Sequence, residues 1–195
     1  MLTGHQDTGN KISRRSHIEG KQNIMLGGKT VIMAGVHLRG DLCRRPETSS
    51  SSDGKEKSQS NTAISIGRAT VVSTNCTIRP PMRLHKGQMT YIPMRIGDNV
   101  FIGPGSHISC ASISSHVYIG ANCVLDSMCI VKECSKIMPG TVVPSGMTVP
   151  AGAIVAGQPA RIVGEVGDGW GQGGGGEGED WVEGGDLRPL VRSIK

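Results

Sequence analysis

The chain has 195 residues and a net charge of +5, and only 3% of its residues are aromatic whereas 29 are glycine. This length suits one domain around one core, and the scarcity of aromatic side chains implies a narrow interior, which argues against a broad sandwich or a helical bundle. The basic residues are scattered and are not interleaved with aromatic ones, which argues against nucleic-acid binding.

The sequence offers no segment for membrane insertion or export. No apolar run approaches the roughly 20 residues that cross a bilayer, and the N-terminal stretch MLTGHQDTGNK has no apolar core of a signal peptide. We therefore expect a cytoplasmic chain without direct membrane insertion. The six cysteines form no C-x-x-C pair, so we expect them to be reduced, small core residues.

Residues 1–11 are expected to form an N-terminal extension, and from Ile12 onward aliphatic residues recur at every sixth position. A period of six is that of hexapeptide β-helix repeats and fits neither an α-helix nor a single strand. The positions are Ile12, Ile18, Ile24, Thr30 (the one polar member) and Val36; then Ile66, Val72, Ile78, Ile96, Ile102 and Ile108; and, after one five-residue step, Ile113, Ile119, Leu125, Val131, Ile137, Val143, Val149 and Val155.

Two further columns follow the same period. Three residues after the aliphatic position stand Gly or Asn, which tolerate a left-handed backbone and so predict corners. They are Asn75, Asn99, Gly105, Asn122, Gly140, Gly146 and Gly152. One residue further on stand slender side chains that we expect to point inward: Thr70, Cys76, Ser106, Val117, Cys123, Cys129, Ser135, Thr141 and Ala153.

Three flat sides of six residues close a triangular coil of about 18 residues, and such coils stack on one another. The pattern resembles that of hexapeptide-repeat proteins, and this resemblance implies a left-handed turn, an exception to the right-handed crossover rule. We therefore predict an all-β fold, a left-handed parallel β-helix, over residues 12–163.

Three segments depart from the register. Residues 43–63 are Ser-rich, charged and nearly free of apolar residues, and they predict a disordered insertion between coils. Residues 79–93, with prolines at both ends, predict a protruding loop. Residues 164–195 predict a flexible Gly-rich tail. The end of this tail predicts a short amphipathic segment that docks on the coil, through Trp181, Leu187, Leu190, Val191 and Ile194.

Zinc catalysis is one chemistry that hexapeptide coils support, and the stretch LRGDL at 38–42 resembles the γ-class carbonic anhydrases. Three His ligands would hold a zinc ion that activates water. Laid on this sequence, the ligand pattern of that family falls on Arg79, Pro104 and Ser109, of which Arg and Pro cannot ligate zinc. His107 is nearby but has no partner at ligand spacing, so we predict no metal site and no other cofactor.

Acyl transfer is the second chemistry, and it stays open as the alternative. In such enzymes a loop His deprotonates the acceptor and coenzyme A lies in a groove between subunits. His85 lies in the segment 79–93, and VAGQPARIVGEV at 155–166 resembles the exit sequence of hexapeptide acyltransferases. The same exit sequence also occurs in hexapeptide proteins that are not enzymes.

Longer strings resemble one particular family. They are GNKISRRSHIEGKQNIMLGGKTVIMAGVHLRGDL (9–42), CTIRPPMRLHKGQMTYIPMRIGDNVFIG (76–103) and NCVLDSMCIVKECSKIMPGTVVP (122–144), and they look like the dynactin subunit 5 family. The long insertion and the Gly-rich tail depart from that family's pattern. The resemblance implies a non-enzymatic subunit of the dynactin pointed-end complex that supports dynein-mediated endosome transport. Its implied partners are dynactin subunit 6, the pointed-end actin-related protein, other pointed-end subunits and cargo adaptors.

The segment 79–93 is the predicted protein-binding site. Prolines stiffen it and basic side chains would suit an acidic partner, since stiff exposed segments on a rigid scaffold often bind other molecules. A solvated connector is the alternative. The predicted contact residues are Arg79, Pro80, Pro81, Arg83, His85 and Lys86.

Overall fold

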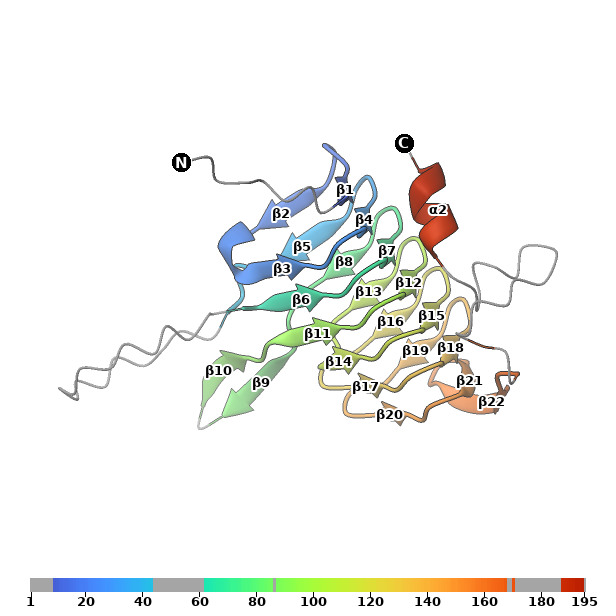
Figure 1. Cartoon of the computed structure of the whole chain (residues 1–195). Coiled ribbons are helices and arrows are strands. Elements are labelled where there is room, and N and C mark those ends of the chain that lie inside the picture. The colour runs from blue at the N-terminus through green and yellow to red at the C-terminus, as the bar shows by residue number, and fades with distance from the viewer. Residues whose placement is uncertain (1–8, 44–61, 86, 168–169, 171–186, 195) are drawn as a thin grey trace, which may run out of the picture.

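The chain winds into a triangular coil of short parallel strands (Figure 1). The computed structural model describes residues 9–43, 62–85, 87–167, 170 and 187–194. The strands stack in three sheets, here called face A, face B and face C, one for each side of the prism. The predicted left-handed parallel β-helix is confirmed. Of the expected insertion at 43–63, residues 44–61 lie outside the described part of the chain.

Each turn of the coil contributes one strand to each face. Face A contains β1 (Lys11–Ile12), β4 (Val31–Ile32), β7 (Val71–Val72), β12 (Phe101–Ile102), β15 (Tyr118–Ile119), β18 (Lys136–Ile137), β21 (Ala153–Ala156) and the antiparallel β22 (Arg161–Glu165). Face B contains β2 (His17–Glu19), β5 (His37–Arg39), β8 (Thr77–Ile78), β13 (His107–Ile108), β16 (Val124–Leu125) and β19 (Val142–Val143). Face C contains β3 (Ile24–Leu26), β6 (Ile64–Ile66), β11 (Met94–Ile96), β14 (Ser112–Ile113), β17 (Ile130–Val131) and β20 (Thr148–Val149).

The predicted aliphatic column forms the core. From Ile66 to Val155, every aliphatic residue of the six-residue series is at most 3% exposed. The slender residues of the second inward column are buried as predicted, and their hydroxyl groups join successive coils: Thr70 donates to the carbonyl of Gly97 at 3.0 Å, and Ser106 to that of Gly120 at 3.0 Å. The hydroxyl groups of Thr70 and Ser106 are therefore satisfied although they are buried, because each has a backbone acceptor one coil away.

The corner prediction is also confirmed. All seven predicted Asn and Gly residues have φ between +54° and +72°. Ala69, His116, Met128 and Cys134 occupy the same position in other sides and also have positive φ. The coil thus imposes a left-handed backbone at its corners whatever the side chain, at a cost of about 1–2 kcal/mol for a residue that has a Cβ.

The N-terminal register is wrong beyond Ile18. Leu26, rather than Ile24, pairs with Ile66. The cause is the 3-10 turn η1 (Lys21–Asn23), which lies between β2 and β3 and lengthens that side by two residues. Ile24 is itself only partly exposed, so its aliphatic character gave no sign of the shift.

The shift continues into the second coil. Its inward residues are Ile32 and Leu38, which pair with Val72 and Ile78, rather than Thr30 and Val36. Thr30 and Val36 are nevertheless fully buried, because they occupy the second inward column.

All six cysteines are free. Four of them, including Cys76 and Cys123, are buried, and Cys43 and Cys134 are half-buried. Burial raises the pKa of the Cys76 and Cys123 thiols, which keeps them protonated at neutral pH. Their S–H groups point to the carbonyls of Gly103 and Met138 in the next coil.

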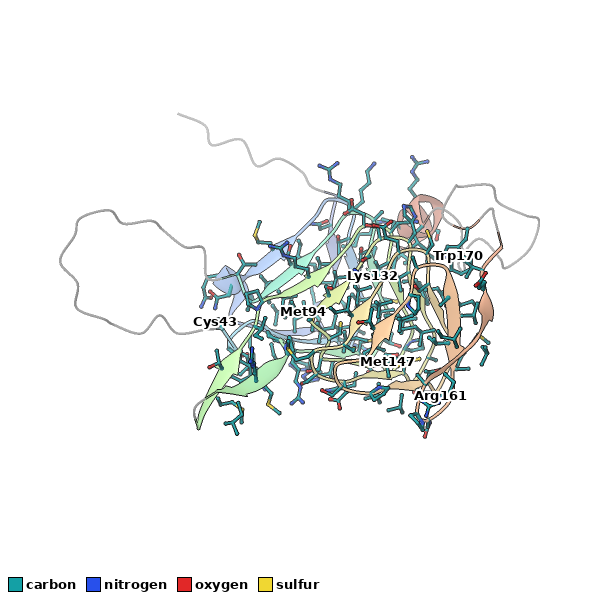
Figure 2. All side chains as sticks on the ribbon, turned by 90° about the horizontal axis from the view of Figure 1, so that it is seen from below. Cys43, Met94, Lys132, Met147, Arg161 and Trp170 are labelled. Carbon is teal, nitrogen blue, oxygen red and sulfur yellow. The ribbon has the colours of Figure 1, made fainter. Side chains whose placement is uncertain are left out.

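The edge between faces B and C holds the departures from regular spacing. In successive coils they are the turn η1, the insertion after Cys43, a hairpin formed by β9 (Met82–His85) and β10 (Gln88–Tyr91), and the five-residue step from Ile108 to Ile113. Figure 2 labels Cys43 and Met94 on the side from which the hairpin projects.

The end of the chain lies on face A. The helix α2 (Arg188–Ser193) packs there, with Leu187 and Val191 against Val31 and Val71, so the predicted docking is confirmed for residues 187–194. Trp181 lies outside the described residues. None of the helices in the described ranges is long and apolar enough to span a bilayer.

Candidate protein-binding site

The segment 79–93 contains a β-hairpin that projects from the prism (Figure 1). Pro80 and Pro81 are buried at its base, and the carbonyl of Pro81 accepts a hydrogen bond from the Ile92 amide at 2.9 Å. Gly87, with φ of +76°, lies in the tight turn between the strands. Two prolines and a closing hydrogen bond therefore set the direction in which the hairpin leaves the coil.

The two sides of the hairpin differ in chemistry. Met82 pairs with Tyr91 and Leu84 with Met89, and these four residues share one side because alternate pairs face the same way. Leu84 is 68% exposed, Met89 55% and Met82 39%. The opposite side includes the pair of Arg83 and Thr90. The hairpin thus presents an apolar side, defined here as Met82, Leu84, Met89 and Tyr91, to solvent.

The predicted site residues do not form one cluster. Arg79 is half-buried at the end of β8, and Arg83 is exposed on the polar side of β9. His85 ends β9, and its side chain is not described; Lys86 lies outside the described residues. The sequence reasoning emphasised charge and missed the apolar side. The alternation of apolar and polar residues in MRLH and QMTY was the signal for it.

An ionic cluster lies next to the base of the hairpin. Arg39 donates to both carboxylate oxygens of Asp41 at 2.8 Å, and its Nε is 3.1 Å from Glu19 Oε2. The hydrogen bond from Arg39 lowers the pKa of Asp41. The same bond is the main cause of the raised pKa of Arg39, with smaller contributions from Glu19 and from Tyr91 of the hairpin. The polar groups of LRGDL therefore pair with one another and with the preceding coil.

The positions expected for zinc ligands have structural roles. The Arg79 amide donates to the Ile108 carbonyl and the Ser109 amide to the Leu125 carbonyl, while Pro104 is exposed at a corner. The Ser109 hydroxyl is buried and has no hydrogen-bond partner within the described ranges.

His107 has one acidic neighbour, Asp126. It lies on the outer side of β13, between Thr77 and Val124 of the adjacent rungs. Burial lowers the pKa of His107 and the positive charge of Arg79 lowers it further, so the neutral ring is favoured. Across the part of the chain that the structure describes, no three His, Cys, Asp or Glu side chains are grouped to hold a metal ion.

The exit sequence at 155–166 serves to end the coil. Its residues complete β21, turn, and return as β22 antiparallel to it. Ala160 within the turn is buried, and its amide donates to the Val142 carbonyl at 2.8 Å. Contacts of this kind give the exit sequence a structural role in closing the last coil.

Known proteins similar to this chain include dynactin subunit 5 and gamma carbonic anhydrases. The family model for dynactin subunit 5 matches residues 53–171. Dynactin subunit 5 of Dictyostelium discoideum is 40% identical over 107 residues, covering 55% of this chain and 44% of that protein. Mitochondrial gamma carbonic anhydrase 2 of Arabidopsis thaliana is 24% identical over 146 residues, covering 75% of this chain and 45% of that protein.

Among solved structures, a hexapeptide transferase family protein from Anaplasma phagocytophilum has a TM-score of 0.59 at 18% identity, covering 95% of this chain and 93% of that one. This likeness supports the fold alone. The chain spans less than half the length of the two relatives from Dictyostelium and Arabidopsis. The family model, in contrast, covers more than half of the chain.

Proposed function

Because the chain belongs to the dynactin subunit 5 family, we propose that it is a non-enzymatic structural subunit of the dynactin pointed-end complex. In this role it binds dynactin subunit 6, the pointed-end actin-related protein and other pointed-end subunits. It supports the attachment of dynein and dynactin to cargo such as endosomes, through cargo adaptors, in the cytoplasm and in association with the cytoskeleton. The work is that of a scaffold for microtubule-based transport.

The apolar side of the hairpin is the observation that supports this proposal most directly. Monomeric proteins seldom expose several large apolar side chains together unless another molecule covers them. Methionine side chains adapt to different partners because they are flexible and polarisable. Arg83 on the opposite side and Arg79 at the base add positive charge, which would direct an acidic partner toward the hairpin. We assign the hairpin to a pointed-end or cargo contact.

The N-terminal end of the prism is our candidate for the dynactin subunit 6 contact. Strands β1, β2 and β3 end their sheets and pair with one neighbour each. Ile12, the first residue of the inward column on face A, is 46% exposed, and among the described strands β1 has a neighbour on one side only. A partner coil stacked there would supply backbone partners to the edge strands and would bury Ile12.

The first test is co-purification of a tagged full-length chain from cells. The proposal expects dynactin subunit 6 and the pointed-end actin-related protein to be recovered with it. Recovery of a soluble chain without dynactin subunits, or with bound coenzyme A and acyl-transfer activity, would contradict the proposal.

The second test concerns the hairpin itself. Leu84→Asp with Met89→Asp should weaken recovery of one pointed-end or cargo partner and leave the melting temperature unchanged, since both side chains are exposed. Val124→Asp is the matched control, because Val124 is an exposed apolar residue on face B, outside the hairpin. Arg83→Glu with Lys86→Glu tests the contribution of charge. If both double variants retain every partner and support normal endosome movement, the hairpin is only a connector.

A further inference from the structure

One stripe of side chains runs down the outer side of face A. The pairing register aligns Lys11, Val31, Val71, Phe101, Tyr118 and Lys136 on successive rungs. Phe101 and Tyr118 stack with ring centroids 5.3 Å apart. Val31 and Val71 point away from the interior of the prism, yet each is only 1% exposed. Something outside the coil therefore covers this stripe.

The cover is the end of the same chain. Leu187 and Val191 are buried against Val31 and Val71, and Leu190 and Ile194 pack at the margin of this cluster. Figure 1 shows α2 on the outside of the prism, near the face A strands. Trp170 covers the next part of the stripe, because Lys136 Nζ lies 6.0 Å from its ring and 5.8 Å from that of Tyr118.

Both ends of the segment 187–194 are held by polar contacts from the coil. At the start, the Leu187 amide donates to Asn99 Oδ1 at 3.0 Å. At the end, Lys11 Nζ donates to the Val191 carbonyl at 2.8 Å and also to the carbonyl of Ile194. The coil thus offers an apolar surface with an amide oxygen at one end and an ammonium group at the other. The first accepts from the free N–H groups at the start of a short helix, and the second donates to the free carbonyls at its end.

We propose that this stripe is a binding site for a short amphipathic helix and that residues 187–194 are its exchangeable occupant. The matching partner is a helix of another protein with apolar residues at positions 1, 4, 5 and 8, as in Leu187, Leu190, Val191 and Ile194 of this chain. When α2 leaves, Val31, Val71 and Phe101 become an apolar surface of the kind that binds partners. This site is separate from the hairpin, and its Lys11 end lies on β1, the face A strand at the N-terminal end of the prism.

Two features allow the exchange. The cluster that holds α2 shares no residue with the main core, so the coil keeps its interior when α2 leaves. The helix has only six residues, and so short a helix is not stable without the surface beneath it. The covalent tether keeps α2 at high local concentration and hence bound until a competing helix is present.

The experiment uses the full-length chain and a fluorescent peptide of residues 185–195. Leu187→Asp with Val191→Asp removes the chain's own occupant and leaves the stripe intact. The peptide should bind this variant saturably, and the wild type about tenfold more weakly or worse, because the tethered segment competes. Lys11→Met added to the variant should weaken binding, whereas Lys29→Met, at an exposed lysine of the second coil, should not. A peptide with Val191→Asp should not bind.

Hydrogen exchange on the wild-type chain tests the same idea without a variant. The Val191 and Ile194 amides, bonded within α2, should exchange at least about a hundredfold faster than the Ile119 amide in the core. Equally slow exchange would make α2 a fixed part of the fold and would overturn the proposal. Absence of peptide binding to the folded variant with Leu187→Asp and Val191→Asp would do the same. Dimers that form by exchange of C-terminal segments would assign the site to a second copy of this chain instead.

Discussion

Replacing Val131 by Asp tests the inward register directly. Val131 lies on β17, is fully buried, and is aligned with Ile113 on one side and Val149 on the other. These vertical neighbours come from adjacent coils, whereas the residues next to Val131 in the six-residue series belong to the other two faces. A carboxylate at this position would therefore disturb three coils.

The magnitude follows from burial. Losing a fully buried valine costs about 1.5–3 kcal/mol. An unpaired carboxyl group in the same place costs several kcal/mol more, even after it takes up a proton. The total, about 5 kcal/mol or more, is comparable with the whole stability of a typical domain, about 5–15 kcal/mol. We expect Val131→Asp to be insoluble or largely unfolded in buffer.

Urea unfolding followed by circular dichroism measures the effect. Ile130→Asp is the matched control, because Ile130 precedes Val131 on the same strand and faces outward. It should shift the free energy of unfolding by about 1 kcal/mol or less. A Val131→Asp chain with an unchanged midpoint would show that this strand does not place Val131 inward.

Three further predictions test single features of the coil. Ser109→Ala should raise the free energy of unfolding by about 1 kcal/mol in urea titrations, because it removes a buried hydroxyl that has no hydrogen-bond partner within the described ranges. A loss of stability would show that the hydroxyl has such a partner. Gly103→Ala should lower the free energy of unfolding by about 1–3 kcal/mol, since a Cβ there would lie 2.5 Å from the backbone of the next coil. Gly140→Asn should cost less, because Gly140 has φ of +71° and open space around it. Equal losses in the two variants would refute the packing argument. The pKa of His107 is lowered by burial and by Arg79, so below about pH 6.5 the unfolded chain takes up a proton that the folded chain resists. Thermal unfolding should show stability falling as the pH drops below that value, and His107→Gln should reduce this fall; an unchanged pH profile would mean that His107 is not responsible.

The coil was predictable because the same local rule recurs in every turn. An aliphatic residue, a left-handed corner and a slender inward residue follow one another at fixed spacing, so an error at one position is corrected by the others. Ala69 and Met128 are corner residues of types that rarely adopt positive φ, yet they do so here. Their neighbours above and below determine their conformation, which explains why the repeat identifies the corner better than the residue type does.

The N-terminal register could not be counted correctly for a related reason. Only two inward residues, Ile12 and Ile18, precede the turn η1, and Ile24 then satisfies the period by coincidence. Two repeats are too few to reveal a two-residue shift, whereas the long series after Ile66 reveals the five-residue step at Ile108 at once.

The hairpin was located by the sequence, but its chemistry was not. Prolines and basic residues drew attention to a stiff charged loop, and the structure contains a two-stranded ribbon with an apolar side. Lys86 and Gly87 separate two runs of alternating residues, which is a hairpin signal that the irregular length of the segment obscured. The distinction matters for function, because Leu84 and Met89, 68% and 55% exposed, add an apolar surface to a hairpin that also exposes Arg83.

A β-helix can bear such additions because each coil is held by the coils above and below. Ile66 pairs with Ile96 on face C, and Ile78 with Ile108 on face B, so the inward columns continue past the hairpin. The chain that leaves at the end of face B returns at the start of face C, and closing a longer loop between these points costs little. Binding groups can therefore be placed on the edge between faces B and C while the core stays unchanged. The positions expected for zinc ligands lie within the coil itself, where the main-chain groups of Arg79, Pro104 and Ser109 pair with neighbouring coils.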